Sequence, residues 1–458
     1  MKGVHSNMPR TKAIAVAIIT GLLAIGAWAL TTSGKIAIFD LTTASQSARR
    51  TPTGSPQLVA VNALPAADGE MCEWVPASSQ TLLVAALQQE RAAAGAVSTA
   101  PTDEGERPAV DADRAPVRVL RDNYPTYSAV AVDPLRKEIV LQDENLFNIM
   151  VYDRMANTPP TATMTEPKRV IGGHETKVEF NCGLYIDPTS GDIYSVNNDT
   201  MDTLVVFSRN AKGNVPPDRE LHTPHRAYGI AVDEEAQELF LTIEHPPQVV
   251  VYHKMASGQE KPIRNLEGES TRLQDAHGIA LDTKNNLMFV SNHGSASNPR
   301  VAGGGHFDPP SITVYPLKAT GDVAPLKIIQ GPKTQLNWPA QMYLDEKRGE
   351  LYVANDVGNS ILVFRTTDSG DTSPVRVIKG PKTGLLNPTG VFVDATNQEL
   401  VIANMGNHSA TVYPLLANGD VTPVRTIRSA PIGKRALAIG NPGAVGYDTK
   451  RDEVLVPN

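Results

Sequence analysis

The sequence predicts an all-β fold, a seven-bladed β-propeller built from four-stranded antiparallel blades. Three observations predict it. Short apolar and β-branched runs are separated by turn residues rather than helix caps. An aspartate that ends a strand recurs about every fifty residues, and a second strand-like segment repeats beside it. Four strands repeating at about this length are the pattern of one propeller blade.

The clearest copy of the repeat is residues 337–380. Its apolar runs predict strands A to D at 341–344, 350–354, 360–364 and 375–378. Asp345 ends strand A, where its carboxylate can accept a backbone N–H of the following turn. Pro374 precedes strand D, and since proline cannot donate to a ladder, we expect D to be the outer strand.

The number of blades follows from the aspartates that end strand A, which are Asp133, Asp187, Asp233, Asp282, Asp345, Asp394 and Asp448. Strand C is found only six times, as IMVYD, LVVFS, VVVYH, ITVYP, ILVFR and ATVYP. The blade that starts at Asn441 stops at Asn458 before any C strand. APVRVLRD at 115–122 resembles a D strand, so we expect this N-terminal strand to complete that blade and close the ring.

Two alternatives for the incomplete blade remain open. KIAIFDL at 35–41 resembles a C strand and is a candidate for the missing one. The second alternative is that the natural chain continues beyond Asn458, for instance through a UGA codon read as selenocysteine. Coding sequence beyond that codon would resemble a C strand and its turn.

The N-terminal region divides into two segments. Residues 1–30 have a basic start and an apolar run at 13–30, which predicts a cleaved signal peptide or a retained signal anchor. Residues 31–114 are rich in Ala, Pro, Ser, Thr and Glu, which predicts a disordered linker with one short helix at 78–94. The propeller then spans 115–458. Both readings of the first segment make the protein extracytoplasmic, either periplasmic, secreted or anchored.

Composition limits the partners. The net charge is −7 and no long Lys/Arg cluster occurs, which excludes a nucleic-acid binder. We expect a monomer that binds a small molecule or a protein and meets a membrane only through an uncleaved 13–30 segment. Cys72 and Cys182 are the two cysteines, either paired in an exported protein or left as thiols.

The repeat also predicts where a site lies. The residues five before each closing Asp are expected to ring the mouth of the central channel: Ser128, Cys182, Tyr228, His277, Ala340, Thr389 and Gly443. Glycine follows four of them, which indicates close backbone approach. The B-to-C loops are expected to add a second ring on that face: Asp143, Asn197, Glu244, Asn292, Asn355, Asn404 and Asn458.

Departures from a repeat are more informative than its constant residues, because the fold requires the constant ones. The departures are Cys182, Tyr228, Glu244, His245, His277, His293 and His306. With Asn292, Asn355 and Asn404, the first six form the predicted ligand-binding set. The recurring asparagines also have a structural reading, as hydrogen-bonding partners of loop backbone.

Two kinds of chemistry are conceivable for these side chains. Imidazole, carboxylate and thiolate groups bind divalent metals, and Glu244, His277 and His293 are the metal candidates. For nucleophilic catalysis the pair would be Cys182 with His277. The alternative for each histidine is a packed or solvated side chain, since no compact metal motif is present.

Two segments, HGIALDTKNNLMFVSN and PTGVFVDATNQELVIANMGNHSATVY, resemble repeats of the NHL and YVTN type. These repeats form extracytoplasmic propellers and belong with the lactonase-like propeller superfamily. The fold also resembles gluconolactonase-type propellers, which implies a divalent cation held near the channel mouth by a Glu, two Asn and an Asp. Here Asn292, Asn355 and Asn404 match in residue type, and the channel-mouth ring has no Glu.

Taken together, the sequence predicts a propeller that binds a ligand or protein on its channel-mouth face, without assigned catalysis. A lactonase-like or metal-dependent hydrolase is the first alternative, and a redox protein that uses Cys182 is the second.

Overall fold

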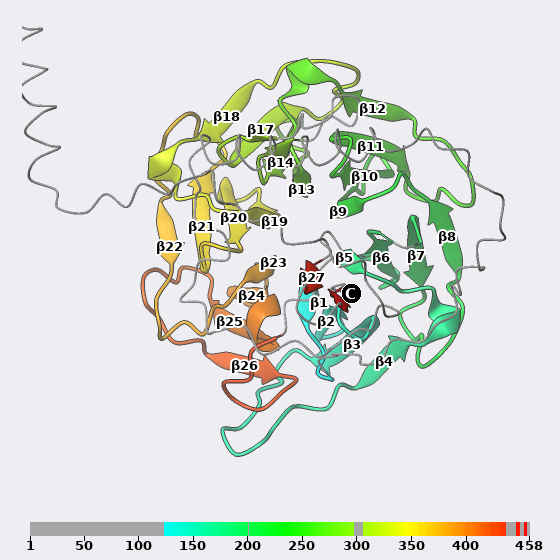
Figure 1. The fold of residues 1–458 in the computed structure, drawn as a ribbon, viewed down its shortest axis with the longest axis vertical. Coiled ribbons are helices and arrows are strands. Elements are labelled where there is room, and N and C mark those ends of the chain that lie inside the picture. The colour runs from blue at the N-terminus through cyan, green and yellow to red at the C-terminus, as the bar shows by residue number, and fades with distance from the viewer. Residues whose placement is uncertain (1–122, 200, 297–305, 437–445, 449–452, 456–458) are drawn as a thin grey trace, which may run out of the picture. The chain divides into compact units, whose positions relative to one another are not determined.

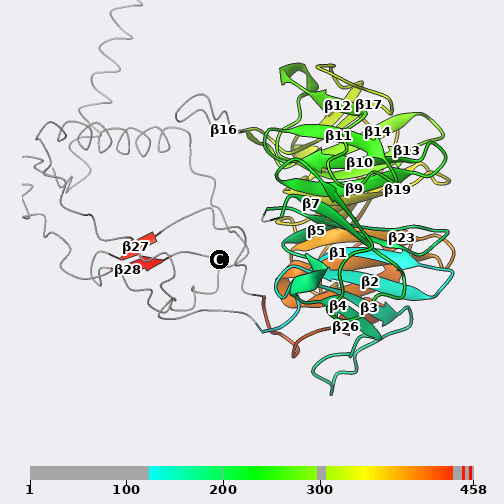
Figure 2. The same cartoon turned by 90° about the vertical axis from the view of Figure 1, so that its right-hand side faces the viewer.

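The computed structural model describes residues 123–199, 201–296, 306–436, 446–448 and 453–455. Six four-stranded antiparallel sheets stand as blades around a central channel (Figure 1). In each blade the chain runs from the channel outward, so the first strand is the inner one and the last is the outer edge. Figure 2 shows the same blades turned by 90°. The prediction of an all-β propeller with four-stranded blades is therefore confirmed.

Blade one consists of β1 (Tyr127–Asp133), β2 (Glu138–Asp143), β3 (Asn148–Asp153) and β4 (Arg169–Gly172). Blade two consists of β5 (Asn181–Ile186), β6 (Ile193–Asn197), β7 (Thr203–Phe207) and β8 (Arg219–His222). Blade three consists of β9 (Ala227–Asp233), β10 (Glu238–Ile243), β11 (Gln248–His253) and β12 (Arg264–Glu267). The 3-10 turns η2 (His174–Thr176) and η3 (Glu269–Thr271) follow the outer strands of blades one and three.

Blade four consists of β13 (Ala276–Asp282), β14 (Leu287–Asn292), β17 (Ser311–Pro316) and β18 (Lys327–Gln330). Blade five consists of β19 (Pro339–Asp345), β20 (Glu350–Asn355), β21 (Ser360–Arg365) and β22 (Arg376–Ile378). Blade six consists of β23 (Pro388–Asp394), β24 (Glu399–Asn404), β25 (Ser409–Pro414) and β26 (Arg425–Arg428). In blade four the insertion adds the hairpin of β15 (Ser295–Ala296) and β16 (His306–Phe307). The turns η4 (Pro332–Thr334) and η5 (Met405–Asn407) complete the elements of these blades.

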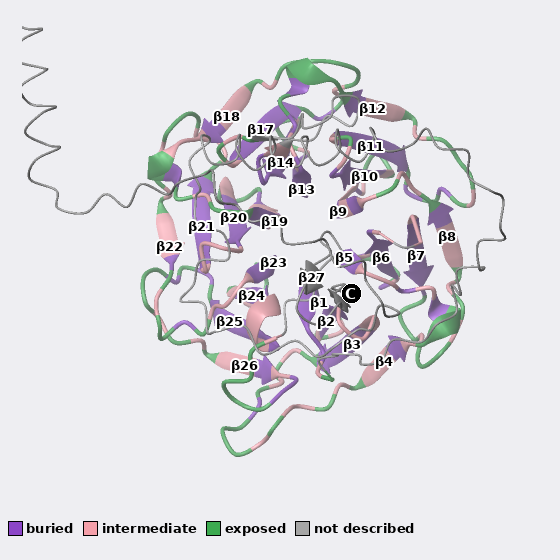
Figure 3. Ribbon diagram, viewed as in Figure 1, coloured by how far each residue is buried: buried purple, intermediate pink, exposed green. Residues whose placement is uncertain are grey.

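The third strand of every blade carries an aromatic ring that is almost fully buried. These residues are Tyr152, Phe207, Tyr252, Tyr315, Phe364 and Tyr413. Burying such a side chain stabilises the fold by about 1.5–3 kcal/mol, so this position explains the repeated VY and VF pairs of the sequence. Figure 3 shows that buried residues concentrate in the strands, whereas the outer turns are exposed.

The prediction of seven blades is wrong, because the described chain forms six. The strand that ends at Asp448, β27 (Gly446–Asp448), pairs with β28 (Glu453–Leu455) as a separate two-stranded sheet and joins none of the six blades. Blade six instead packs directly against blade one, where a Cβ added to Gly390 would come within 3.0 Å of the Ala129 Cα. The six C strands gave the correct blade number, whereas counting aspartates included a strand outside the ring.

The ring is closed by a contact that repeats around it. In five interfaces, a glycine in the turn between the third and fourth strands donates its N–H to the outer strand of the preceding blade: Gly213, Gly258, Gly321, Gly370 and Gly419. In blade one, Thr158 occupies this place and donates to Thr426 O of blade six at 2.7 Å. An ion pair of 2.6 Å between Arg154 and Glu399 reinforces this interface. The described blades therefore close the ring by direct contact between blades six and one.

The channel is narrow at its axis. A Cβ at Gly229 would come within 2.3 Å of His277 O, and one at Gly278 within 2.3 Å of Ala340 O, so only glycine fits there. The Gln341 side chain donates from blade five to Cys182 O of blade two. On the side of the turns after the inner strands, a mainly apolar cavity of about 540 Å³ lies among the inner strands, with Val132, Ile186 and Phe392 in its lining.

Several predictions fall on residues outside the described ranges. These are the signal segment 1–30, the linker 31–114 with its helix, the 115–122 strand, Cys72 and the end of the chain. Within the described ranges, the structure contains no helix with the length and apolarity needed to cross a membrane.

Candidate functional site

Three positions recur at the channel mouth, and one backbone hydrogen bond defines them. The loop position immediately precedes the inner strand, the strand position is the second residue of that strand, and the rim position immediately follows the second strand. In every blade the N–H at the rim position donates to the carbonyl at the loop position, over 2.9–3.1 Å. The fold thereby brings the three side chains of a blade together, whatever residues they are.

The residues at these positions differ from blade to blade. The loop positions hold Thr126, Phe180, Arg226, Asp275, Trp338 and Asn387; the strand positions hold Ser128, Cys182, Tyr228, His277, Ala340 and Thr389; the rim positions hold Glu144, Asn198, Glu244, His293, Asp356 and Met405. Five of the six loop positions have a left-handed backbone, with φ between 40° and 65°.

The register of the second predicted ring needs a correction of one residue in blade three. Glu244 does not correspond to Asn197 or Asn292, which end their strands, because the end of β10 is Ile243. Its counterparts are Asn198 and His293, at the rim position. Glu244 therefore belongs with the side chains that face the site.

The predicted ligand-binding asparagines have structural partners. Asn292 accepts from Gln274 N at 3.0 Å, and Asn355 accepts from Asn337 N at 2.6 Å. Asn404 donates to Thr411 Oγ1 at 3.0 Å. All three are buried at the ends of their strands. Asn292 and Asn355 therefore hold loop backbone, as expected for Asn at a strand end, whereas Asn404 bonds a side chain of the neighbouring strand.

Blade four supplies a cluster of one carboxylate and two imidazoles. Asp275, His277 and His293 are buried, and one ligand atom from each lies within 4.8 Å of the others. Asp275 Oδ1 is 3.6 Å from His277 Nδ1, and Asp275 Oδ2 is 3.9 Å from His293 Nδ1. The two imidazole rings stack with centroids 3.4 Å apart.

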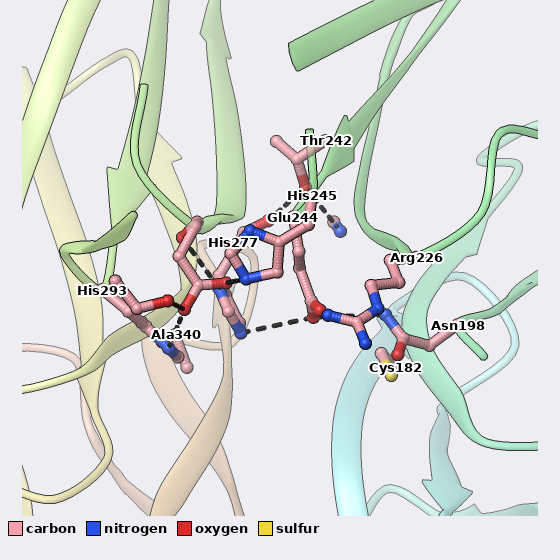
Figure 4. Close-up of polar contacts among 12 residues, drawn as sticks. Cys182, Asn198, Arg226, Thr242, Glu244, His245, His277, His293 and Ala340 are labelled. Atoms are coloured by element: carbon pink, nitrogen blue, oxygen red, sulfur yellow. Dashed lines mark hydrogen bonds and ion pairs between the residues drawn. The ribbon is translucent and has the colours of Figure 1, made fainter. Parts of the chain in front are cut away.

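Blade three adds a carboxylate and a third imidazole to this cluster. Glu244 Oε1 is 3.4 Å from His277 Nε2 and accepts from Asn198 Nδ2 at 3.2 Å. His245 Nε2 is 3.5 Å from Asp275 Oδ1. Figure 4 shows His277 and His293 on one side of Glu244, with Arg226, Asn198 and Cys182 on the other.

Neighbouring backbone and hydroxyl groups hold the cluster in place. Thr242 accepts from Gly229 N at 2.7 Å and donates to His277 O, which fixes the strand position of blade four. His277 Nδ1 lies 3.0 Å from the Asp275 carbonyl, and Ser295 donates to Asp275 Oδ2 at 2.7 Å. A hydrogen bond from blade three therefore positions His277, and hydrogen bonds within blade four position Asp275.

Two histidines of the cluster, His293 and His245, have lowered pKa values. Burial lowers the pKa of His293 well below its usual range, and the neighbouring His277 lowers it further. Burial also lowers the pKa of His245. Within the described part of the chain, neither ring nitrogen of His293 and not the Nδ1 of His245 has a hydrogen-bond partner. Buried polar atoms are usually hydrogen-bonded, and His293 has both ring nitrogens available to a ligand.

The carboxylates that surround the cluster have raised pKa values. Burial raises the pKa of Glu244 above its usual value. Burial, together with the charges of Glu244, Asp143 and Asp356, raises the pKa of Glu144 to about 7. Burial raises the pKa of Asp356 to about 6. Carboxylates from blades one, three and five therefore influence one another at the mouth, which favours a cation there.

Aromatic rings complete the walls. Tyr228 packs on His277 with ring centroids 4.1 Å apart. Trp338 packs on His293 at 4.8 Å and remains 40% exposed. The site thus has a buried polar floor and one open aromatic wall.

Cys182 does not have the surroundings of a reactive thiol. It is free and buried, and its Sγ lies 3.3 Å from the Phe180 carbonyl. Burial raises the pKa of the Cys182 thiol well above its usual value, as do the charges of Glu144 and Glu244. A nucleophilic or redox cysteine needs the opposite shift.

Of the residues predicted from sequence, the structure brings together His277, His293, Glu244, His245 and Tyr228. His306 lies in β16 of the insertion. Sequence reasoning missed Asp275, Arg226 and Trp338, which share the loop position. A comparison of the six blades at the position two residues before the channel-mouth ring would have revealed them, because this position is occupied by a different residue in every blade. Such a comparison would also have shown that one blade brings together Asp275, His277 and His293.

No protein-family model and no curated protein matches this chain. Among solved structures, hydrazine synthase of Kuenenia stuttgartiensis aligns with a TM-score of 0.44 and 11% identity, covering 66% of this chain and 99% of that one. An alignment of this quality has no bearing on the chemistry of the site. The propeller follows from the order of the sheets, and the resemblance to NHL and YVTN repeats stays a prediction.

Proposed function

We propose that this protein is a metal-binding propeller that holds a divalent transition metal at its channel mouth and presents it to a small-molecule ligand. Asp275, His277 and His293 of blade four are the proposed ligands. The observation that carries the proposal is His293, a neutral and buried imidazole whose two nitrogens lack hydrogen-bond partners beside a carboxylate.

The donor set limits the metal. Two imidazoles and one carboxylate suit zinc, iron(II) or cobalt(II), whereas calcium and magnesium prefer sites made of oxygen atoms. A neutral imidazole needs no deprotonation to bind, which favours binding near pH 7. Three ligands from the protein leave coordination positions for water or a ligand, as in catalytic zinc sites.

The contacts around the ligands support this assignment. A ligating histidine usually has its second nitrogen held by a carboxylate or carbonyl. His277 meets Glu244 through Nε2 and the Asp275 carbonyl through Nδ1, so either nitrogen can bind while the other is held. A bound dication would also offset the repulsion among Glu144, Glu244 and Asp356.

A metal-dependent hydrolase is the second candidate. It is favoured by Glu244, a buried carboxylate in contact with His277 and therefore beside the open coordination positions. A carboxylate with a raised pKa at this place is suited to act as a base toward a metal-bound water. We also propose an extracytoplasmic location, on the strength of the basic and apolar segment at 1–30.

The test is a titration of the chelator-treated protein with Zn²⁺ or Co²⁺ by calorimetry. We expect one metal per chain, with affinity reduced at least about 100-fold in Asp275→Asn, His277→Ala and His293→Ala. The control is His253→Ala, which removes an exposed histidine at the end of β11. Absence of stoichiometric binding, or equal loss in the control, would refute the metal site. For the hydrolase, retention of full lactone or ester hydrolysis in Glu244→Gln would exclude the proposed base.

A further inference from the structure

We infer that the small molecule bound at this centre is a flat organic carboxylate, with its anionic end between the metal and Arg226 and its planar body against Trp338. This inference rests on the proposed metal site. It assigns ligand recognition to the blades on either side of blade four.

Arg226 lies at the loop position of blade three, the counterpart of Asp275. Its side chain is 38% exposed, and Figure 4 shows the guanidinium pointing toward Glu244 at the edge of the cluster. Its Nε is 3.9 Å from Asp199 Oδ1, which is longer than a hydrogen bond. A guanidinium in this position can bind a carboxylate through two parallel N–H donors.

Trp338 lies at the loop position of blade five, on the other side of Asp275. Its indole packs on the His293 ring with a tilt of 34°, and 40% of the residue is exposed. An exposed indole beside a polar floor is a stacking surface for a flat group. Because Arg226 and Trp338 occupy equivalent positions in flanking blades, they stand on opposite sides of the blade-four cluster.

The backbone at these two positions is left-handed, as it is at every loop position except that of Thr126. Arg226 and Trp338 have φ values of 65° and 55°, in the left-handed region that disfavours large side chains. Asn387, the counterpart in blade six, shows the residue type that this backbone accepts most easily. Phe180 and Asp275 share this backbone, so the assignment of Arg226 and Trp338 to binding rests on the chemistry and exposure of their side chains.

The charges of the site select a monoanion. Glu144, Glu244 and Asp356 face the mouth, and Arg226 is the cation that acts on both Glu244 and His245. A carboxylate monoanion brings less negative charge to these acidic side chains than a phosphate dianion does. A carboxylate needs only one metal position and one Arg fork.

The experiment uses the full chain loaded with Zn²⁺ and titrated with benzoate, cyclohexanecarboxylate, benzamide and inorganic phosphate. Affinity is measured by calorimetry, and the signal of Trp338 is obtained as the fluorescence difference from Trp338→Phe. We expect benzoate to bind and to change the Trp338 signal, and the other three probes to bind at least about 10-fold more weakly.

Arg226→Met should weaken benzoate about 10- to 100-fold, and Arg226→Lys by less, while Zn²⁺ binding is unchanged. The control is Arg272→Met, which removes an exposed arginine with the same left-handed backbone in blade four. Benzoate binding that is absent, or equal in Arg226→Met, overturns the inference and leaves the metal site intact. Equal affinity for phosphate overturns the assignment to carboxylates, and failure to bind Zn²⁺ overturns both proposals.

Discussion

The substitution His293→Phe separates a metal ligand from a packed core histidine. Phenylalanine keeps the ring stack on His277 at 3.4 Å and on Trp338 at 4.8 Å. It removes two buried nitrogens that have no hydrogen-bond partner in the described part of the chain. If His293 is held for a metal, the metal-free variant should be more stable than the wild type, although it has lost a polar residue.

The magnitude follows from the state of the imidazole. His293 is neutral near pH 7, because burial lowers its pKa, so the substitution removes no charge. A buried polar atom without a partner costs about 1–3 kcal/mol, and fitting a slightly larger ring offsets part of the gain. We therefore expect a net stabilisation of about 1–2 kcal/mol. For a propeller of this length, this corresponds to a rise in Tm of roughly 1–4 °C.

Metal should reverse the order of stabilities. At a concentration 100-fold above its Kd, a metal stabilises the wild type by about 2.7 kcal/mol, whereas His293→Phe should gain nothing. Thermal unfolding with chelator and with Zn²⁺ gives the four values needed, and exposed His253→Phe should behave as the wild type. A metal-free His293→Phe less stable than the wild type, or one that is still stabilised by Zn²⁺, would refute the reasoning.

Three further predictions follow from other contacts. Hydrogen bonds from Arg376 lower the pKa of Glu350 to about 2, from a usual value of 4.5. This pair therefore stabilises the fold above pH 4.5 and loses its effect as the pH falls through about 2. After solvent screening, Glu350→Gln should reduce the free energy of unfolding by about 1–2 kcal/mol at pH 7 and leave it unchanged near pH 2, as measured by urea unfolding. Cys182 should react with iodoacetamide only after unfolding, as judged by intact mass, and rapid labelling of the native protein would contradict its burial. Gly229→Ala should destabilise the fold by about 1–3 kcal/mol and weaken Zn²⁺ binding, because its Cβ would displace the backbone that carries His277; unchanged calorimetric titration would disprove this coupling.

The strands of a blade could be predicted from local sequence patterns, but the way in which the ring closes could not. Strand boundaries in 337–380 agree with β19 to β22 within a few residues, because hydrophobic runs and turn residues act locally. Closure depends on which distant segments meet. Thr158 takes the place of the glycine used in the other blades, so the contact between blades one and six has no repeated sequence signal.

The site residues could also be predicted only in part from the sequence. His277, His293 and Glu244 stood out from the repeat as unusual residues, but spacing alone placed Glu244 one residue out of register. The reason is that β10 ends in Ile243 where four other blades have Asn, so the usual marker of the strand end is missing. Only the hydrogen bond from Glu244 N to Arg226 O establishes the correct register.

A repeat fold permits this kind of site because backbone and side chains have separate tasks. The bond between rim and loop positions forms in all six blades with very different side chains, from Met405 and Asn387 to His293 and Asp275. The three mouth positions therefore converge in every blade, and their residues can vary without loss of the fold. A metal site of this kind would need only three residues within one blade, and Ser295 of the blade-four insertion adds a hydrogen bond to Asp275. This accounts for the absence of a compact motif in the sequence, because the rest of β13 and all of β14 lie between His277 and His293.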